Sequence, residues 1–174
     1  RLWVEDAGPL AWMAPDGHAS VAVLAWAKAA QADPGDVVIE AFGCDPDPAF
    51  VAAMAARVQR TGRAPVWINL ESLSAEAWVE RCHGLPSPVL AGAGRGLTKH
   101  FFYPGFTTAT GGLLREPDVP ERQATFDADR WLASLGIERQ GHRLLSLFCY
   151  EPPGLAPMLD QLASAPEPTV LLVT

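Results

Sequence analysis

The stretch PVWINLESLSAEAWVERCHGLPSP, from Pro65 to Pro88, decides the fold, because in it an apolar run passes directly into Asn69 and Glu71. This order is typical of a strand buried in an α/β sheet that delivers polar side chains to a cleft at its carboxyl end. Further along, KHFFYPGFTTATGGLLRE, from Lys99 to Glu116, takes a run of aromatic residues into a loop of Gly, Thr and Pro. We therefore expect an α/β protein with a site where its strands end.

The residues before this stretch predict a complete βαβ unit. Val37 to Ile39 form a β-branched run of the kind that a parallel sheet buries. Asp47 can cap a helix, Pro48 suits its first position, and Gly62 ends it. Strand, helix and strand therefore follow one another up to Leu70, and their crossover should be right-handed.

Weaker patterns predict the remaining elements. These are strands over 2–5, 99–103, 144–150 and 170–173, helices over 10–13, 123–135 and 155–162, a strand or helix over 21–26, and a short helix capped by Ser74. Glycines at 92, 94 and 96 resemble a phosphate-binding loop, but no buried strand leads into them. A flexible surface loop is the favoured interpretation there.

Composition limits the classes of function. The chain has 174 residues, enough for one domain and the beginning of another, and its net charge of −7 disfavours a nucleic-acid surface and favours a basic partner. No apolar run approaches the roughly 18 residues that a membrane helix needs, and Arg1 begins no leader-like segment, so we expect a cytoplasmic protein. Both ends fall inside expected strands, which indicates a fragment of a longer protein.

Polar residues at the ends of the expected strands are the first candidates for a site. Glu40 and Glu71 could each orient a cationic acceptor or act as a base, but each could equally cap a helix or face water. For Asn69, contact with a ligand competes with a bridge to the backbone. Glu80, Cys82 and His83 are spaced too closely to hold a metal together, so no metal site is predicted.

The loop after the aromatic run is the second candidate. Gly111 and Gly112 permit a close backbone approach, and Thr107 and Thr110 supply hydroxyl groups beside Phe106. This mixture suits recognition of a sugar or a peptide. It suits an ordinary tight turn equally well.

Two aromatic residues near the carboxyl end form the third candidate. Phe148 and Tyr150 alternate at the end of the strand predicted over 144–150, so they should project from one face. They could stack on a nucleotide base and contact its ribose. For Phe148 the alternative is packing in the core.

Four segments together resemble one enzyme family. They are VIEAFGC (38–44), VWINLESLSAEAWVERCHGLPSP (66–88), FFYPGFTTATGGLLRE (101–116) and SLFCYE (146–151). They are similar to the bacterial arginine rhamnosyltransferases that modify elongation factor P. The resemblance implies a B-type glycosyltransferase with two Rossmann-like parallel-sheet domains, which transfers rhamnose from dTDP-β-L-rhamnose to an arginine with inversion and needs no metal.

The resemblance also implies how the chain is divided. Residues 1–140 would form the acceptor-binding domain without its first strand and helix, and residues 141–174 the start of the nucleotide-sugar domain. Phe148 and Tyr150 would bind the donor. The family's catalytic aspartates would lie before Arg1, so this stretch alone is expected to be inactive. From the residue patterns above, we assign to the acceptor side or cleft Glu40, Asn69, Glu71, Phe106, Thr107, Thr110, Gly111 and Gly112.

Two alternatives stay open. The chain could belong to another B-type glycosyltransferase or nucleotide-sugar enzyme, or it could be a non-catalytic α/β module that binds a protein. An aspartate-bearing loop directly before Arg1 would favour the transferase.

Overall fold

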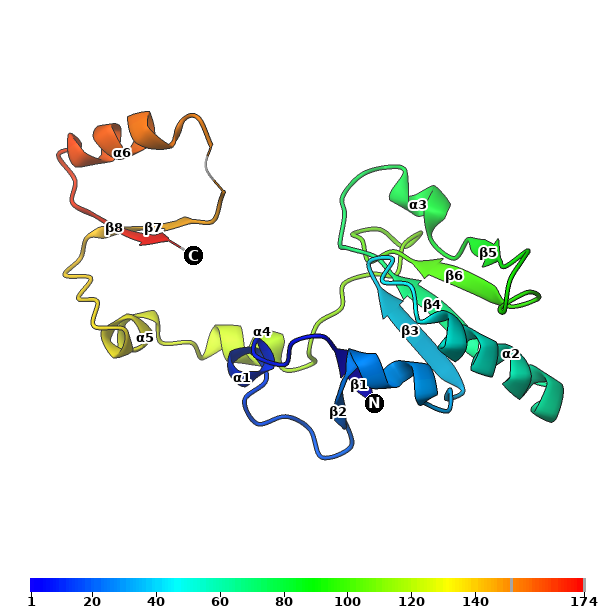
Figure 1. Cartoon of the computed structure of the whole chain (residues 1–174). Helices are drawn as coiled ribbons and strands as arrows, with labels where there is room; N and C mark the ends of the chain where they lie inside the picture. The colour runs from blue at the N-terminus through cyan, green and yellow to red at the C-terminus, as the bar shows by residue number, and fades with distance from the viewer. Residues whose placement is uncertain (151, 174) are drawn as a thin grey trace. The chain divides into compact units, whose positions relative to one another are not determined.

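The computed structural model describes residues 1–150 and 152–173 and forms two compact units, Arg1–Leu114 and Arg115–Thr174 (Figure 1). The domain boundary predicted at 140/141 therefore falls within the second unit. The assignment of these residues to two Rossmann-like domains stays a prediction.

A four-stranded sheet forms the centre of the first unit (Figure 1). Its order is β3 (Val37–Ala41), β4 (Val66–Leu70), β6 (Thr98–Phe102) and β5 (Pro86–Pro88). The first three strands run parallel, as the sequence predicted, and β5 pairs antiparallel with β6. The sequence did not predict β5, because proline is disfavoured in strands, but its position at the sheet edge tolerates residues that donate no amide hydrogen.

Helix α2 (Pro48–Thr61) connects β3 to β4 and covers one face of the sheet (Figure 1). Its predicted ends are confirmed: the Asp47 carboxylate accepts a hydrogen bond from the Ala49 amide at 2.7 Å, and Gly62 ends the helix with a φ of +68°. The β3–α2–β4 segment is therefore the predicted βαβ unit.

The core of the first unit lies between α2 and the sheet. Phe50, Met54, Trp67 and Leu97 are buried there together. Gly94 belongs to the same layer, because a Cβ atom at this position would lie 2.5 Å from a methyl carbon of Val51. The prediction of a surface loop fits Gly92 and Gly96, which are exposed, but not Gly94, which is buried against α2.

A smaller parallel sheet precedes the main one. It consists of β1 (Leu2–Val4) and β2 (Val23–Ala25), with α1 (Leu10–Met13) between them and the 3-10 helix η1 (Trp26–Gln31) after them. A cavity of about 330 Å³ is lined by consecutive residues 1–3 and 37–41, together with Trp26 and Phe50. The unpaired edges of β1 and β3 thus both border this cavity.

Helix α3 (Val79–Cys82) is shorter than the sequence suggested. The Ser74 hydroxyl oxygen accepts a hydrogen bond from the Glu76 amide at 3.1 Å, which makes a local turn and not a helix cap. The prediction of a helix that begins at Ser74 is therefore wrong. The turn at Ser74 ends before the helix begins at Val79.

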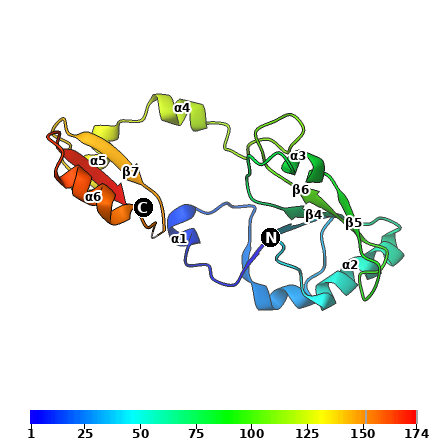
Figure 2. The same cartoon turned by 90° about the horizontal axis from the view of Figure 1, so that it is seen from above.

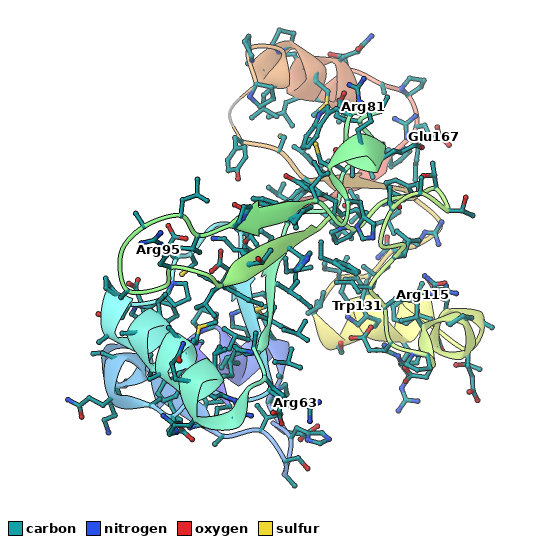
Figure 3. The ribbon with its side chains drawn as sticks, turned by 90° about the vertical axis from the view of Figure 1, so that its right-hand side faces the viewer. Arg63, Arg81, Arg95, Arg115, Trp131 and Glu167 are labelled. Atoms are coloured by element: carbon teal, nitrogen blue, oxygen red, sulfur yellow. The ribbon has the colours of Figure 1, made fainter. Side chains whose placement is uncertain are left out.

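The second unit contains a parallel pair of strands, β7 (Arg143–Leu147) and β8 (Thr169–Val173), and Figure 2 shows α6 (Leu155–Ala163) alongside them. The helix predicted over 123–135 is two helices, α4 (Val119–Ala124) and α5 (Ala128–Ser134). The Asp127 carboxylate causes the break, since it accepts from the Arg130 amide at 2.9 Å and starts α5. Leu132 is buried, whereas Trp131, labelled in Figure 3, is exposed.

Within residues 1–150 and 152–173, every helix is too short or too polar to span a lipid bilayer.

Met54 provides a test of the core. Its side chain is fully buried, so Met54→Ala should lower the free energy of unfolding by about 2–5 kcal/mol, measured by urea denaturation followed by tryptophan fluorescence. Met13→Ala is the matched control, because Met13 is 63% exposed and its truncation should change the stability by less than about 0.5 kcal/mol. Equal effects of the two substitutions would contradict this placement of the core.

Candidate functional site

The carboxyl ends of β3, β4 and β6 bring the predicted polar residues together. The strand register pairs Glu40 with Asn69, and Asn69 with Phe101, so these three residues form one row across the sheet. Glu71 follows directly after β4. This arrangement agrees with the prediction that Glu40, Asn69 and Glu71 lie where the strands of a parallel sheet end.

The Glu40 carboxylate is buried and has two partners within the sheet. One oxygen accepts from the Trp67 indole nitrogen at 3.0 Å, and the other accepts from the Lys99 ammonium at 2.5 Å. The same ammonium lies 3.0 Å from an Asp45 carboxylate oxygen and 5.0 Å from the centre of the Trp67 ring. The carboxylate predicted to orient a cation therefore already holds one, supplied by the chain itself.

Lys99 remains charged in this cluster. Burial favours its neutral form, but the hydrogen bonds and negative charges of Glu40 and Asp45 outweigh burial and raise the pKa of Lys99 above its ordinary value. Sequence reasoning missed both Lys99 and Trp67, because neither stands near Glu40 in the chain.

Asn69 is a buried bridge between two loops. Its side-chain oxygen accepts from the Gly43 amide at 2.9 Å, and its side-chain nitrogen donates to a Glu71 carboxylate oxygen at 2.6 Å. Of the two alternatives left open by the sequence, a bridge to the backbone is the one observed. The same side chain also fixes the position of a carboxylate.

The turn held by Asn69 is strained. Phe42 has a φ of +56°, in the left-handed region that a residue with a Cβ atom adopts at a cost of about 1 kcal/mol or more, and its side chain is 66% exposed. Its amide donates to the Leu70 carbonyl oxygen at 2.8 Å. Strained backbone conformations of this kind cluster at functional sites.

Glu71 differs from Glu40 in having no cationic partner. Its residue is half-buried, and no lysine, arginine or histidine within the described ranges forms an ion pair with it. Arg81 on α3 and Arg95 in the loop between β5 and β6 are labelled in Figure 3, and neither forms an ion pair with Glu71 within the described ranges.

Tyr103 lies beside Glu71 and was not predicted as a site residue. Burial raises the pKa of its phenol above the ordinary value, and electrostatic interactions with Glu71 and Cys82 raise this pKa further. The Tyr103 ring makes an edge-on contact with Trp78 at 5.4 Å and stacks with Phe101 at 6.2 Å between ring centres. Tyr103, which interacts electrostatically with Glu71, thus belongs to a cluster of three aromatic rings.

The loop predicted to recognise a sugar or peptide uses several of its polar groups in hydrogen bonds within the loop. The Thr110 hydroxyl donates to the Thr107 carbonyl oxygen at 2.8 Å and accepts from the Gly112 amide at 3.4 Å. A Cβ atom at Gly111 would lie 2.4 Å from the ring of Phe102, so only glycine fits there. These contacts favour the tight-turn interpretation for Thr110, Gly111 and Gly112, while Phe106 and Thr107 remain exposed.

His83 has a structural partner. Its Nδ1 atom accepts from the Tyr103 amide at 3.1 Å, and its ring lies edge-on to Phe102 at 5.0 Å. In the part of the chain that the structure describes, no three histidine, cysteine, aspartate or glutamate side chains are grouped so that they could hold a metal ion.

Phe148 and Tyr150 follow a strand that ends earlier than predicted. Strand β7 ends at Leu147, and the two aromatic side chains are 86% and 99% exposed. The residues that the structure describes therefore do not pack Phe148 into a core. Binding of the donor by these residues stays a prediction.

These features define an α/β protein with a polar and aromatic site at the carboxyl edge of a parallel sheet. Over residues 1–174 the chain matches the family model described as elongation factor P (EF-P) rhamnosyltransferase EarP, and it belongs to that family.

Three curated relatives of the chain all carry the name protein-arginine rhamnosyltransferase. Proteins called protein-arginine rhamnosyltransferase from Pseudomonas putida and Pseudomonas aeruginosa are 46% and 43% identical to it, over 99% of this chain and 48% of their own length. A protein of that name from Neisseria meningitidis serogroup B is 34% identical over 99% of this chain and 45% of its own length. The chain thus spans about half the length of these relatives.

Lys99→Met provides a test of the buried ion pair. The substitution leaves the Glu40 charge buried without its cation, so the free energy of unfolding should fall by about 3 kcal/mol in chemical denaturation. Because the pKa of Lys99 is raised, its contribution is fully present below the ordinary value of 10.5 and is lost as the pH rises through the higher folded value. The loss should therefore be constant from about pH 6 to about pH 9.

The matched control adds Glu40→Gln to Lys99→Met. Glutamine keeps an oxygen that can accept from Trp67 and removes the unpaired charge, so the double variant should recover most of the lost stability. A double variant no more stable than Lys99→Met would contradict this account.

Proposed function

We propose that the protein containing this chain is a protein-arginine rhamnosyltransferase that transfers rhamnose from dTDP-β-L-rhamnose to an arginine of elongation factor P in the cytoplasm. The observation that carries this proposal is the family match, which extends over all 174 residues and is accompanied by relatives of up to 46% identity. The net charge of −7 agrees with an acceptor that presents a basic side chain.

The chemistry requires carboxylates around the acceptor. A guanidinium group is a weak nucleophile, because its charge is delocalised and persists at neutral pH. A carboxylate that localises and orients it, and a base that takes its proton, are therefore needed. In this proposal the base comes from the half of the enzyme that this chain does not span, and Glu71 belongs to the acceptor side.

The donor side is assigned to the second unit. Phe148 and Tyr150 directly follow β7, and ligands of parallel sheets bind beyond the carboxyl ends of strands. Their exposed rings are suited to stack on the thymine base and to contact the ribose. The transfer would be a single inverting displacement in a B-type fold with two Rossmann-like domains, without a metal ion.

Mass spectrometry tests the reaction directly. Elongation factor P incubated with the full-length enzyme and dTDP-rhamnose should gain one deoxyhexose on an arginine, and the gain should disappear when that arginine is replaced by lysine. Absence of the gain with folded components would reject the proposal.

Phe148→Ala tests the donor assignment. Loss of one base-stacking ring should weaken dTDP-rhamnose binding by about tenfold to a hundredfold in calorimetry, while binding of elongation factor P is unchanged. Trp12→Ala is the control, because Trp12 is an aromatic residue that is 75% exposed and lies in the first unit. Unchanged donor binding in Phe148→Ala would remove this residue from the donor site.

A further inference from the structure

The strand register extends beyond the ends of β4 and β6. Trp67 pairs with Lys99, and Asn69 pairs with Phe101, on the face of the sheet that α2 covers. Because side chains alternate along a strand, the next pair on this face is Glu71 and Tyr103. The Glu71 amide donates to the Phe102 carbonyl oxygen at 2.9 Å, which continues the ladder by this step.

Two carboxylates on this face have opposite environments. Glu40 is neutralised by Lys99 and bonded by Trp67. Glu71, in contrast, has one neutral partner, the Asn69 amide, and no cationic partner within the described ranges. Because Glu71 is only half-buried and accepts one hydrogen bond from a neutral amide, its carboxylate keeps lone pairs that can accept from a further donor. A cationic group of a ligand can therefore form charge-assisted hydrogen bonds with it.

The surroundings of Glu71 favour a planar organic cation. The Tyr103 ring stacks with Phe101 and contacts Trp78 edge-on, so its orientation is fixed by packing. A guanidinium group can lie against an aromatic face while it donates to a carboxylate, whereas an ammonium group is more strongly hydrated and has no planar face. A fixed ring beside an unpaired carboxylate is thus better matched to guanidinium.

Asn69 determines where the Glu71 carboxylate lies. Its amide uses its oxygen on the Gly43 amide of the strained turn and its nitrogen on Glu71, so both ends of the side chain are occupied. A side-chain amide can accept from a backbone N–H and donate to a carboxylate at the same time.

We propose that Glu71 and the ring of Tyr103 form the binding site for the guanidinium group of the acceptor arginine, and that Asn69 is the positioning residue that holds the Glu71 carboxylate in it. This assignment rests on the proposed function, because that function makes arginine the acceptor. It specifies which residues of the chain contact the acceptor side chain.

The test compares three variants of the full-length enzyme. Glu71→Gln removes the charge, and Asn69→Asp keeps an oxygen for the Gly43 amide but places a second carboxylate against Glu71. The double variant exchanges the two groups, so that an amide at position 71 can again bond a carboxylate at position 69. The readouts are the melting temperature, the KM for elongation factor P, kcat, and the Kd for dTDP-rhamnose.

Glu71→Gln should raise the KM for elongation factor P at least about tenfold and leave the Kd for dTDP-rhamnose unchanged. Asn69→Asp should raise the same KM and lower the melting temperature. The double variant should regain the melting temperature but not the KM, because its charge lies at the wrong position. Glu76→Gln, at an exposed carboxylate of the following loop, should match the wild type in every readout.

Recovery of both stability and KM in the double variant would show that the pair is only structural and would overturn the proposal. So would an unchanged KM in Glu71→Gln.

A binding experiment separates this site from the reaction itself. In an NMR titration, agmatine, which carries a guanidinium group, should shift the Trp78 indole signal, and 1,5-diaminopentane should shift it much less. The shift should disappear in Glu71→Gln. If the wild type transfers no rhamnose but binds agmatine in this way, the proposed reaction is rejected and the guanidinium site stands. If agmatine and the diamine behave alike, the site is rejected.

Discussion

The Glu40 carboxylate joins three neighbouring strands of the main sheet. It belongs to β3, accepts from Trp67 on β4 and is neutralised by Lys99 on β6. A buried carboxylate is costly without partners, so these three strands are held in one register while the charge is paired. The residues further along the same strands, where the candidate site lies, depend on this register.

The polar residues change character step by step toward the strand ends. Trp67 and Lys99 both bond to Glu40, the Asn69 amide accepts one hydrogen bond and donates another, and Glu71 lies beside Tyr103 without a cation among the described residues. Groups bonded within the chain thus position one carboxylate that has no cationic partner among the described residues. A site built in this way can bind a charged ligand with little rearrangement, because its side chains are already ordered in the folded protein.

Local patterns predicted much of this fold, and contacts between distant residues account for what was missed. The ends of α2 follow from Asp47 and Gly62, which act within one helical turn, and β3 follows from its β-branched run. The position of Glu40 and Glu71 at one edge also followed from strand order. The sequence did not predict which of these two carboxylates has a cationic partner, because Lys99 stands 59 residues from Glu40. Tyr103 was overlooked because only the register with β4 brings it beside Glu71.

Strand β5 has a consequence for how these molecules behave at high concentration. Two of its three residues are prolines, so the outer margin of the main sheet offers few amide hydrogens to another polypeptide. Neighbouring molecules therefore cannot readily extend the sheet from this side by strand addition, the first step of many fibrils. The protein gains protection against self-association from residues that contribute no side chain to the candidate site.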